Sequence, residues 1–166
     1  MIRFNFESPK SPLKGKLLFL RNEYSFYFEV EDDLTLTERT GSEGIASISL
    51  GDLQIKVGIE TGILCYVWGF HPIESWDKEC LPPFVAIPGL IRAHGSNKFQ
   101  HWCGYDLCPN VEWKTLYDSN SGWVQVRKDG ENLKGDFIEF ANGCVALIRD
   151  HTLVSLFLRP CFKDTY

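Results

Sequence analysis

Apolar and polar residues alternate along the segment LQIKVGI, residues 53–59, so that every second side chain is apolar. This period of two predicts a β-strand with one buried face and one face in water. Glu60, Thr61 and Gly62 follow as a short loop with a glycine free to take positive φ, and the chain then returns as residues 63–70. The stretch therefore predicts a β-hairpin, around which we take the rest of the chain to be organised.

The returning strand of this hairpin has no polar face. One side carries Ile63, Cys65 and Val67, and the other side carries the larger set Leu64, Tyr66, Trp68 and Phe70. Such a strand is either central and covered on both sides, or it covers a core with one face and presents an aromatic platform with the other. The sequence leaves both arrangements open.

The same alternation recurs on both sides of the hairpin. Ahead of it, strands are predicted at residues 3–6, 16–20, 24–30, 34–39 and 45–50. After it, strands are predicted at residues 84–91, 111–117, 123–126, 137–140, 144–148 and 152–158, the first of them broken by Pro88 and Gly89. A short helix is expected at residues 72–79, because Pro72 suits a first helical position and acidic residues follow it.

These elements predict an all-β fold. We expect a single domain over residues 1–166, built as a β-sandwich or flattened barrel of roughly ten to twelve mostly antiparallel strands with at most one short helix. The aromatic content of 14% favours sheet over helix as well.

The net charge of −5 is unevenly placed along the chain. Residues 21–62 hold nine acidic and three basic side chains, which leaves this region at −6. An acidic region argues against nucleic acid as the partner and for a basic one, although a face that only keeps the protein soluble gives the same pattern.

The sequence also predicts the cellular compartment of the protein. No apolar stretch is long enough to span a bilayer, and the first ten residues lack the apolar centre of a signal peptide. We therefore expect a cytoplasmic protein without membrane contact, in which the six cysteines are reduced thiols.

The irregular segment 94–109 holds the most tempting candidate for metal chemistry, namely His94, His101, Cys103 and Cys108. Structural zinc sites usually show two ligands separated by two to four residues in each of two knuckles. The spacing here lacks any C-x2-C knuckle, and buried thiols often behave as small apolar groups. We predict no metal and no cofactor.

Signals for catalysis are similarly absent from the sequence. It contains neither G-x-S-x-G nor a glycine-rich phosphate loop, and no spacing selects one of the many possible Cys and His pairs. We predict that the protein is not an enzyme. A small hydrolase or nuclease that uses loop residues such as His71, His94 and Lys98 stays open as an alternative.

A carbohydrate-binding module is a second alternative, because a β-sandwich can expose aromatic side chains that stack on sugar rings. Apolar neighbours place Trp68 and Trp123 in the core, whereas Trp76 and Trp102 lie beside charged and polar residues and are expected to be partly exposed. Exposed aromatic residues next to charges are typical of protein interfaces too.

The pattern E-T-G-x3-Y-V-x-G-F-x-P-x3-W runs from Glu60 to Trp76. Together with the strand before it, this stretch resembles a hairpin found in some small bacterial immunity proteins of contact-dependent growth inhibition and polymorphic-toxin systems. The resemblance covers residues 53–76 and implies a cytoplasmic protein that binds the C-terminal domain of a cognate toxin, often a basic nuclease. Such proteins neutralise the toxin by covering its active site, and the resemblance carries no catalytic residues.

This hypothesis assigns a partner-binding role to two groups of residues. Acidic side chains would pair with lysine and arginine of the toxin domain and raise the association rate, and aromatic anchors would supply affinity. The acidic candidates are Glu29, Glu31, Asp32, Asp33 and Glu38. The candidate anchors are Trp76 and Trp102.

Overall fold

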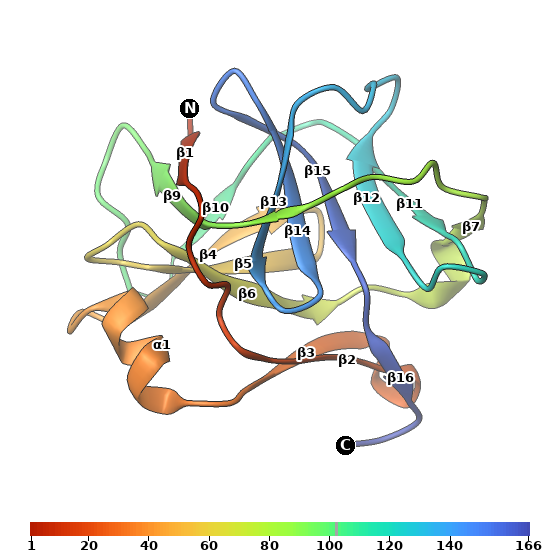
Figure 1. Cartoon of the computed structure of the whole chain (residues 1–166), viewed down its shortest axis with the longest axis horizontal. Coiled ribbons are helices and arrows are strands. Elements are labelled where there is room, and N and C mark those ends of the chain that lie inside the picture. The colour runs from red at the N-terminus through yellow and green to blue at the C-terminus, as the bar shows by residue number, and fades with distance from the viewer. Residues whose placement is uncertain (102) are drawn as a thin grey trace.

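The computed structural model describes residues 1–101 and 103–166 and has the predicted all-β architecture. Two seven-stranded sheets and a two-stranded ribbon pack as a β-sandwich (Figure 1). In the described part of the chain neither large sheet closes into a barrel, so of the two expected architectures the sandwich is confirmed. No helix of these residues has the length and apolarity that a membrane span requires.

The first sheet is formed mainly by the N-terminal half of the chain and contains the predicted hairpin at its centre. Its strands, in spatial order, are β10 (Gly104–Asp106), β4 (Ile45–Leu50), β5 (Leu53–Gly58), β6 (Leu64–Phe70), β3 (Ser25–Val30), β2 (Gly15–Leu20) and β16 (Cys161–Lys163).

The second sheet is formed mainly by the C-terminal half. Its strands, in spatial order, are β7 (Asp77–Lys78), β11 (Trp113–Tyr117), β12 (Val124–Lys128), β15 (Thr152–Leu158), β14 (Cys144–Arg149), β13 (Asp136–Ala141) and β8 (Ile87–Pro88). The ribbon pairs β1 (Arg3–Glu7) with β9 (Leu90–His94).

Strand direction follows position in the sheets. Neighbouring inner strands pair antiparallel, whereas the four edge strands β10, β16, β7 and β8 each pair parallel to the strand beside them. Each edge strand is only two or three residues long. Short edge strands limit unwanted pairing with other chains, so the sandwich is protected at its edges.

Inward-facing side chains of both sheets form one large core, which includes Phe19, Phe26, Ile55, Phe140 and Leu156. A second, smaller core lies on the outer face of the second sheet. There Phe84 packs on Phe157 with ring centroids 4.5 Å apart, and Ala86 lies against the same cluster. Residues 79–86 therefore cover this face as a strap, and they explain why β14 and β15 are apolar on both sides.

Strand β6 adopts the second of its two possible arrangements. Cys65 and Val67 are fully buried, whereas Tyr66 and Trp68 are half-buried and Phe70 is 49% exposed. Leu64 leaves the aromatic side, because pairing with β5 shifts between Lys56 and Val57 and turns Leu64 into the core. The strand therefore covers the core with one face and presents aromatic rings on the other.

The predicted strand at residues 34–39 is wrong, because this segment lies in helix α1 (Asp33–Thr40). Asp32 caps the helix by accepting a hydrogen bond from the Leu34 backbone N–H at 3.0 Å. Leu34 stays 67% exposed and only Leu36 packs on the core, so the alternating pattern does not correspond to a buried strand face.

The predicted helix at residues 72–79 is also wrong. The chain forms a single 3-10 turn at Ile73–Ser75 and then extends into β7, which pairs with β11. Trp76 ends the turn with extended backbone angles, φ −82° and ψ 133°, and its side chain enters the core. Burial of this indole favours the extended chain over a continued helix.

Candidate partner-binding surface

The five acidic candidates follow one another along a single continuous segment. Glu29 lies on β3, Glu31 and Asp32 lie in the connection, and Asp33 and Glu38 lie on α1. All are exposed except Glu29, which is half-buried. Helix α1 packs against β5 and β6, so the segment is attached to the first sheet at its hairpin.

Specific contacts hold this acidic segment, residues 29–38, in place. Asp32 accepts a second hydrogen bond from the Thr35 hydroxyl at 2.6 Å, and these bonds hold the pKa of its carboxyl below the usual value. At the other end of α1, Arg39 donates to the backbone oxygens of Phe140, at 3.3 Å, and Ser11. Arg39, the one arginine of the helix, therefore binds backbone oxygens and not a carboxylate of the acidic segment.

The carboxylates of the acidic segment form no ion pair with a described lysine, arginine or histidine of this protein. Four ion pairs form among the described residues, and none of them involves a carboxylate of the acidic segment. The acidic side chains of Glu31, Asp33 and Glu38 therefore face solvent without an internal cation. Their combined field would attract a basic surface and repel an acidic one.

An aromatic stripe lies on the outer face of the first sheet and is made of Tyr27, Tyr66, Trp68, Phe70 and Tyr166. Tyr27 lies between two of its members, with ring centroids 4.4 Å from Trp68 and 5.0 Å from Tyr166. Tyr66 is stacked on Phe28 at 5.4 Å and 8°, which fixes that end of the stripe to the core. Tyrosine and tryptophan on a rigid sheet are the side chains that most often anchor protein interfaces.

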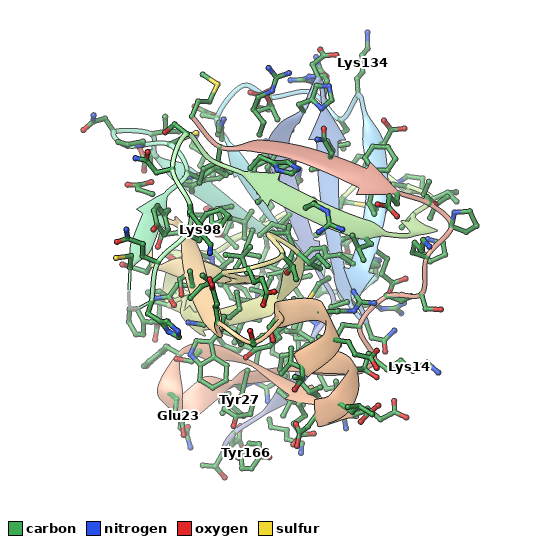
Figure 2. The ribbon with its side chains drawn as sticks, turned by 90° about the vertical axis from the view of Figure 1, so that its left-hand side faces the viewer. Lys14, Glu23, Tyr27, Lys98, Lys134 and Tyr166 are labelled. Atoms are coloured by element: carbon green, nitrogen blue, oxygen red, sulfur yellow. The ribbon has the colours of Figure 1, made fainter. Side chains whose placement is uncertain are left out.

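Glu29 joins the aromatic stripe to the acidic segment. It follows Tyr27 on the same face of β3, and its carboxylate lies beside the hydroxyl of Tyr166. The interaction with this carboxylate raises the pKa of Tyr166. Figure 2 looks toward α1 and shows Tyr27 and Tyr166 side by side at the lower edge of the molecule.

Of the two predicted anchors, Trp76 does not belong to this surface. Trp76 is only 8% exposed and packs against Phe19 and Phe26 at 4.8 and 5.9 Å, so the expectation that it is partly exposed is wrong. Its polar neighbours in sequence misled the prediction, since they point to solvent while the indole turns inward. Trp102 lies outside the described residues.

Trp68 and Trp123, which were expected in the core, are half-buried instead. Trp68 faces outward in the stripe, and Trp123 lies under the strap beside Phe84 at 5.0 Å. The alternation in β6 already separates Trp68 from Val67, so the signal for an outward tryptophan was present in the sequence. Tyr166 enters the stripe through the path of the C-terminal residues, which no local pattern indicates.

The histidines and cysteines do not assemble into a metal site among the described residues. No three side chains of His, Cys, Asp or Glu in residues 1–101 and 103–166 converge in a way that could hold an ion. His71 is buried, with Nε2 2.6 Å from the Thr115 hydroxyl. Cys103 is exposed and Cys108 is half-buried.

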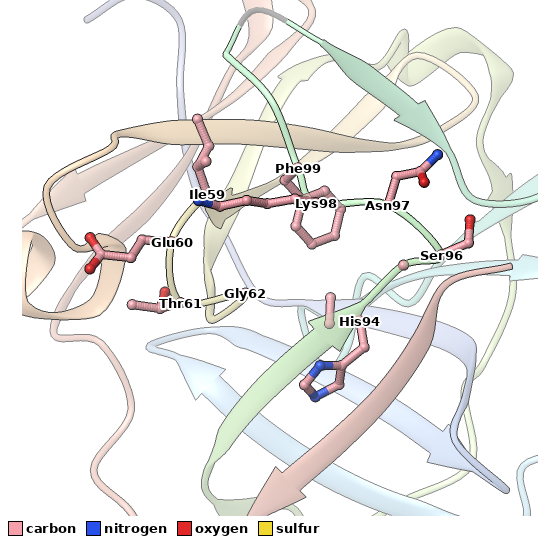
Figure 3. A pocket seen from close by; sticks show the side chains of 11 residues that line it. Ile59, Glu60, Thr61, Gly62, His94, Ser96, Asn97, Lys98 and Phe99 are labelled. Carbon is pink, nitrogen blue, oxygen red and sulfur yellow. The ribbon is translucent and has the colours of Figure 1, made fainter.

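A hollow of about 240 Å³ lies between the β5–β6 turn and residues 94–99, and Lys98 and Glu60 in its lining already have partners (Figure 3). Lys98 forms an ion pair with Glu43 at 2.8 Å, and Glu60 accepts from the Ser42 backbone N–H at 2.7 Å. His94 lies at the opposite rim from Lys98. We therefore centre the candidate site on the acidic segment and the aromatic stripe.

Neither a scan against models of protein families nor a search of curated proteins finds a match to this chain.

Proposed function

We propose that this protein is an immunity protein, which binds a basic toxin domain and occludes its active site by steric and electrostatic means. The observation that carries the proposal is the continuity of the acidic segment with the aromatic stripe through Glu29. The resemblance of residues 53–76 to a hairpin of immunity proteins points to the same class of partner.

The two parts of the surface would act at different stages of binding. Unpaired carboxylates on α1 raise the association rate with a positively charged partner, and this effect weakens as salt screens the charges. The aromatic rings lose little conformational entropy on binding and bury large areas, so they set the dissociation rate. A cytoplasmic inhibitor that acts by occupancy needs both and requires no catalytic group.

The first test is whether the genomic neighbourhood encodes a basic toxin domain immediately upstream, and its absence there would count against the proposal. Where the neighbourhood holds such an adjacent toxin domain, its affinity for this protein is measured by surface plasmon resonance at several salt concentrations. In one variant Glu31, Asp33 and Glu38 are changed to lysine, which spares the capping residue Asp32. The matched control changes three exposed acids outside the acidic segment to lysine, namely Glu79, Glu112 and Asp136.

The first variant is expected to lower the association rate by about tenfold or more and to flatten its salt dependence, whereas the control stays near wild type. Equal effects of the two variants would show that only net charge matters and would sink the proposed site. No binding of the adjacent domain by the unaltered protein would refute the proposed function itself.

A carbohydrate-binding role is the second candidate, and one observation favours it. Beside Trp68 and Tyr66 on the same face lie Gln54 and Lys56, whose polar groups could bind sugar hydroxyls. Glycan binding would depend weakly on salt and would be lost in Trp68→Ala while surviving the reversal of Glu31, Asp33 and Glu38.

A further inference from the structure

A second hollow, of about 360 Å³, lies beside the aromatic stripe on the outer face of the first sheet. Its lining includes Ser47, Gln54, Lys56 and Tyr66 from β4, β5 and β6, together with Gly104 from the edge strand β10. Lys56 pairs across the sheet with Ser47 on β4 and with Tyr66 on β6. The hollow therefore lies over three adjacent strands of one rigid sheet.

Lys56 is held in this hollow by neutral groups. Its Nζ lies 2.9 Å from the Ser47 hydroxyl and 2.8 Å from Gln54 Oε1, and the Ser47 hydroxyl donates to the same oxygen at 3.2 Å. An ammonium group has three N–H donors, so two are used and one is left for a ligand. The side chain is half-buried, and this burial lowers its pKa.

No acidic side chain compensates this charge. Among residues 1–101 and 103–166, no carboxylate lies within ion-pair distance of Lys56, although the chain as a whole is acidic. Tyr66 lines the same hollow and makes no hydrogen bond to another described side chain or backbone group through its hydroxyl. A partly desolvated cation with a spare donor is best satisfied by an anion with hydrogen-bond acceptors.

We infer that this hollow receives a single carboxylate side chain, aspartate or glutamate, from the partner protein. The inference rests on the proposed function and adds to it the chemistry of one contact. The single positive charge of the Lys56 ammonium, with its one spare N–H donor, matches the single charge of a carboxylate. Gln54 and Trp68 are paired across the sheet, so a partner seated on the aromatic stripe passes directly over the hollow.

Such a contact would define specificity as well as affinity. The acidic segment would attract any basic surface. Lys56 would strengthen binding only of a partner that presents a carboxylate at one position, and it would weaken binding of a partner that presents a cation there. The combination of a broad negative surface with one recessed positive group fixes the orientation of the partner.

The first experiment uses the free protein and acetate as the probe. Acetate is titrated against chloride at equal ionic strength while the backbone amides of Ser47, Lys56 and Gly104 are followed by NMR. We expect saturable shifts with acetate only, retained in Lys56→Arg and lost in Lys56→Met. Lys134→Met, a change at an exposed lysine far from the hollow, serves as the control and is expected to behave as wild type (Figure 2).

The second experiment measures binding of the adjacent toxin domain by the same variants. Lys56→Met is expected to weaken binding by about tenfold or more, with Lys56→Arg and Lys134→Met near wild type. Acetate shifts that match those of chloride, or that persist in Lys56→Met, overturn the inference. Unchanged partner affinity in Lys56→Met does so too, yet it leaves the proposed function standing, because the reversal of Glu31, Asp33 and Glu38 reports on that function separately.

Discussion

The imidazole Nε2 of His71 lies 2.6 Å from the Thr115 hydroxyl, and this contact connects the end of β6 in the first sheet with β11 in the second. His71 is buried beside Trp76, at a ring distance of 5.8 Å. Burial lowers the pKa of His71 to about 4, against a smaller opposing effect of Asp52. The contact between the sheets is therefore made by a neutral imidazole.

Acid should weaken the fold through this residue. In the unfolded chain His71 titrates near its ordinary value, so between about pH 6.5 and pH 4 the unfolded state binds a proton that the folded state does not. The free energy of unfolding therefore does not change through His71 above pH 6.5. It falls on acidification below pH 6.5, by about 3 kcal/mol in total once the pH is below 4. Urea unfolding from pH 4 to 8 measures it, with His71→Gln as the comparison. Parallel pH profiles of the two proteins would contradict the prediction.

The sequence suggests Trp76 as a partner-binding anchor and Trp68 as a core residue, and the structure predicts the reverse for substitutions at the two positions. Trp76→Ala removes a buried indole from a packed aromatic cluster, so we expect a loss of about 3 to 5 kcal/mol in the free energy of unfolding. Trp68→Ala removes a half-buried ring and should cost roughly 1 to 2 kcal/mol while weakening partner binding more than Trp76→Phe does. Chemical unfolding and binding measurements on the three variants test this. A Trp76→Phe variant that folds normally but loses the partner would restore Trp76 as an anchor.

Asp118 should control the strap of residues 79–86. Its Oδ2 accepts from the Leu81 backbone N–H at 3.1 Å, and its Oδ1 accepts from Asn120 at 2.9 Å and Ser121 at 3.3 Å. These bonds lower the pKa of Asp118 and fix the strap to the turn between β11 and β12. Asp118→Ala should loosen the strap and expose the small core around Phe157.

Limited trypsin digestion checks this prediction, because Lys78 immediately precedes the strap. We expect faster cleavage there in Asp118→Ala than in wild type, with an intermediate rate in Asp118→Asn, which keeps one acceptor. Glu112→Ala, at an exposed site in the same half, should not change the rate. Identical digestion of all four proteins would show that packing of Phe84 alone holds the strap.

Five of the six thiols should divide into a reactive and a protected group. Burial raises the pKa of Cys65 and of Cys144 to about 12, so neither forms a thiolate in the folded protein. Cys80, Cys103 and Cys161 are exposed. Iodoacetamide at pH 8 followed by peptide mass spectrometry should modify these three first and should reach Cys65 and Cys144 only after denaturation. Early modification of Cys65 would contradict the buried position of β6.

The elements of this fold can be predicted from the sequence where local signals determine them, and not where contacts between distant residues do. The hairpin of β5 and β6 is readable because alternation and a glycine turn are local signals, and both agree with the tertiary structure. The segment at residues 34–39 alternates as well, but Asp32 supplies a helix cap whose effect depends on a hydrogen bond two residues away. At Trp76 the decisive contacts are with Phe19 and Phe26, more than 45 residues distant, so sequence neighbours indicate the wrong environment.

The candidate surface was readable to a similar extent. The acidic segment is contiguous in sequence, so its residues were identified directly. The aromatic stripe was only partly foreseen, because Tyr27 and Tyr166 meet through strand pairing and the path of the C-terminal residues. The isolation of Lys56 from carboxylates depends on which strands are neighbours, and no spacing along the chain encodes that.

Asp32 belongs to the acidic segment but also caps α1, so its two effects need separate variants. Asparagine is as good a capping residue as aspartate, whereas alanine is not. Asp32→Asn should therefore keep the helical circular dichroism and the melting temperature while removing one charge. Asp32→Ala should lower both, because the Leu34 N–H and the Thr35 hydroxyl lose their acceptor.

Partner binding by these two variants separates the effect of the Asp32 charge from the effect of helical order in α1. If the field of the acidic segment drives association, Asp32→Asn and Asp32→Ala should lower the association rate to a similar, modest extent that disappears at high salt. If the shape of α1 matters instead, only Asp32→Ala should weaken binding, and the loss should persist at high salt. The second result would move the partner contact from the carboxylates to the helix itself, since the two variants differ in capping and not in charge.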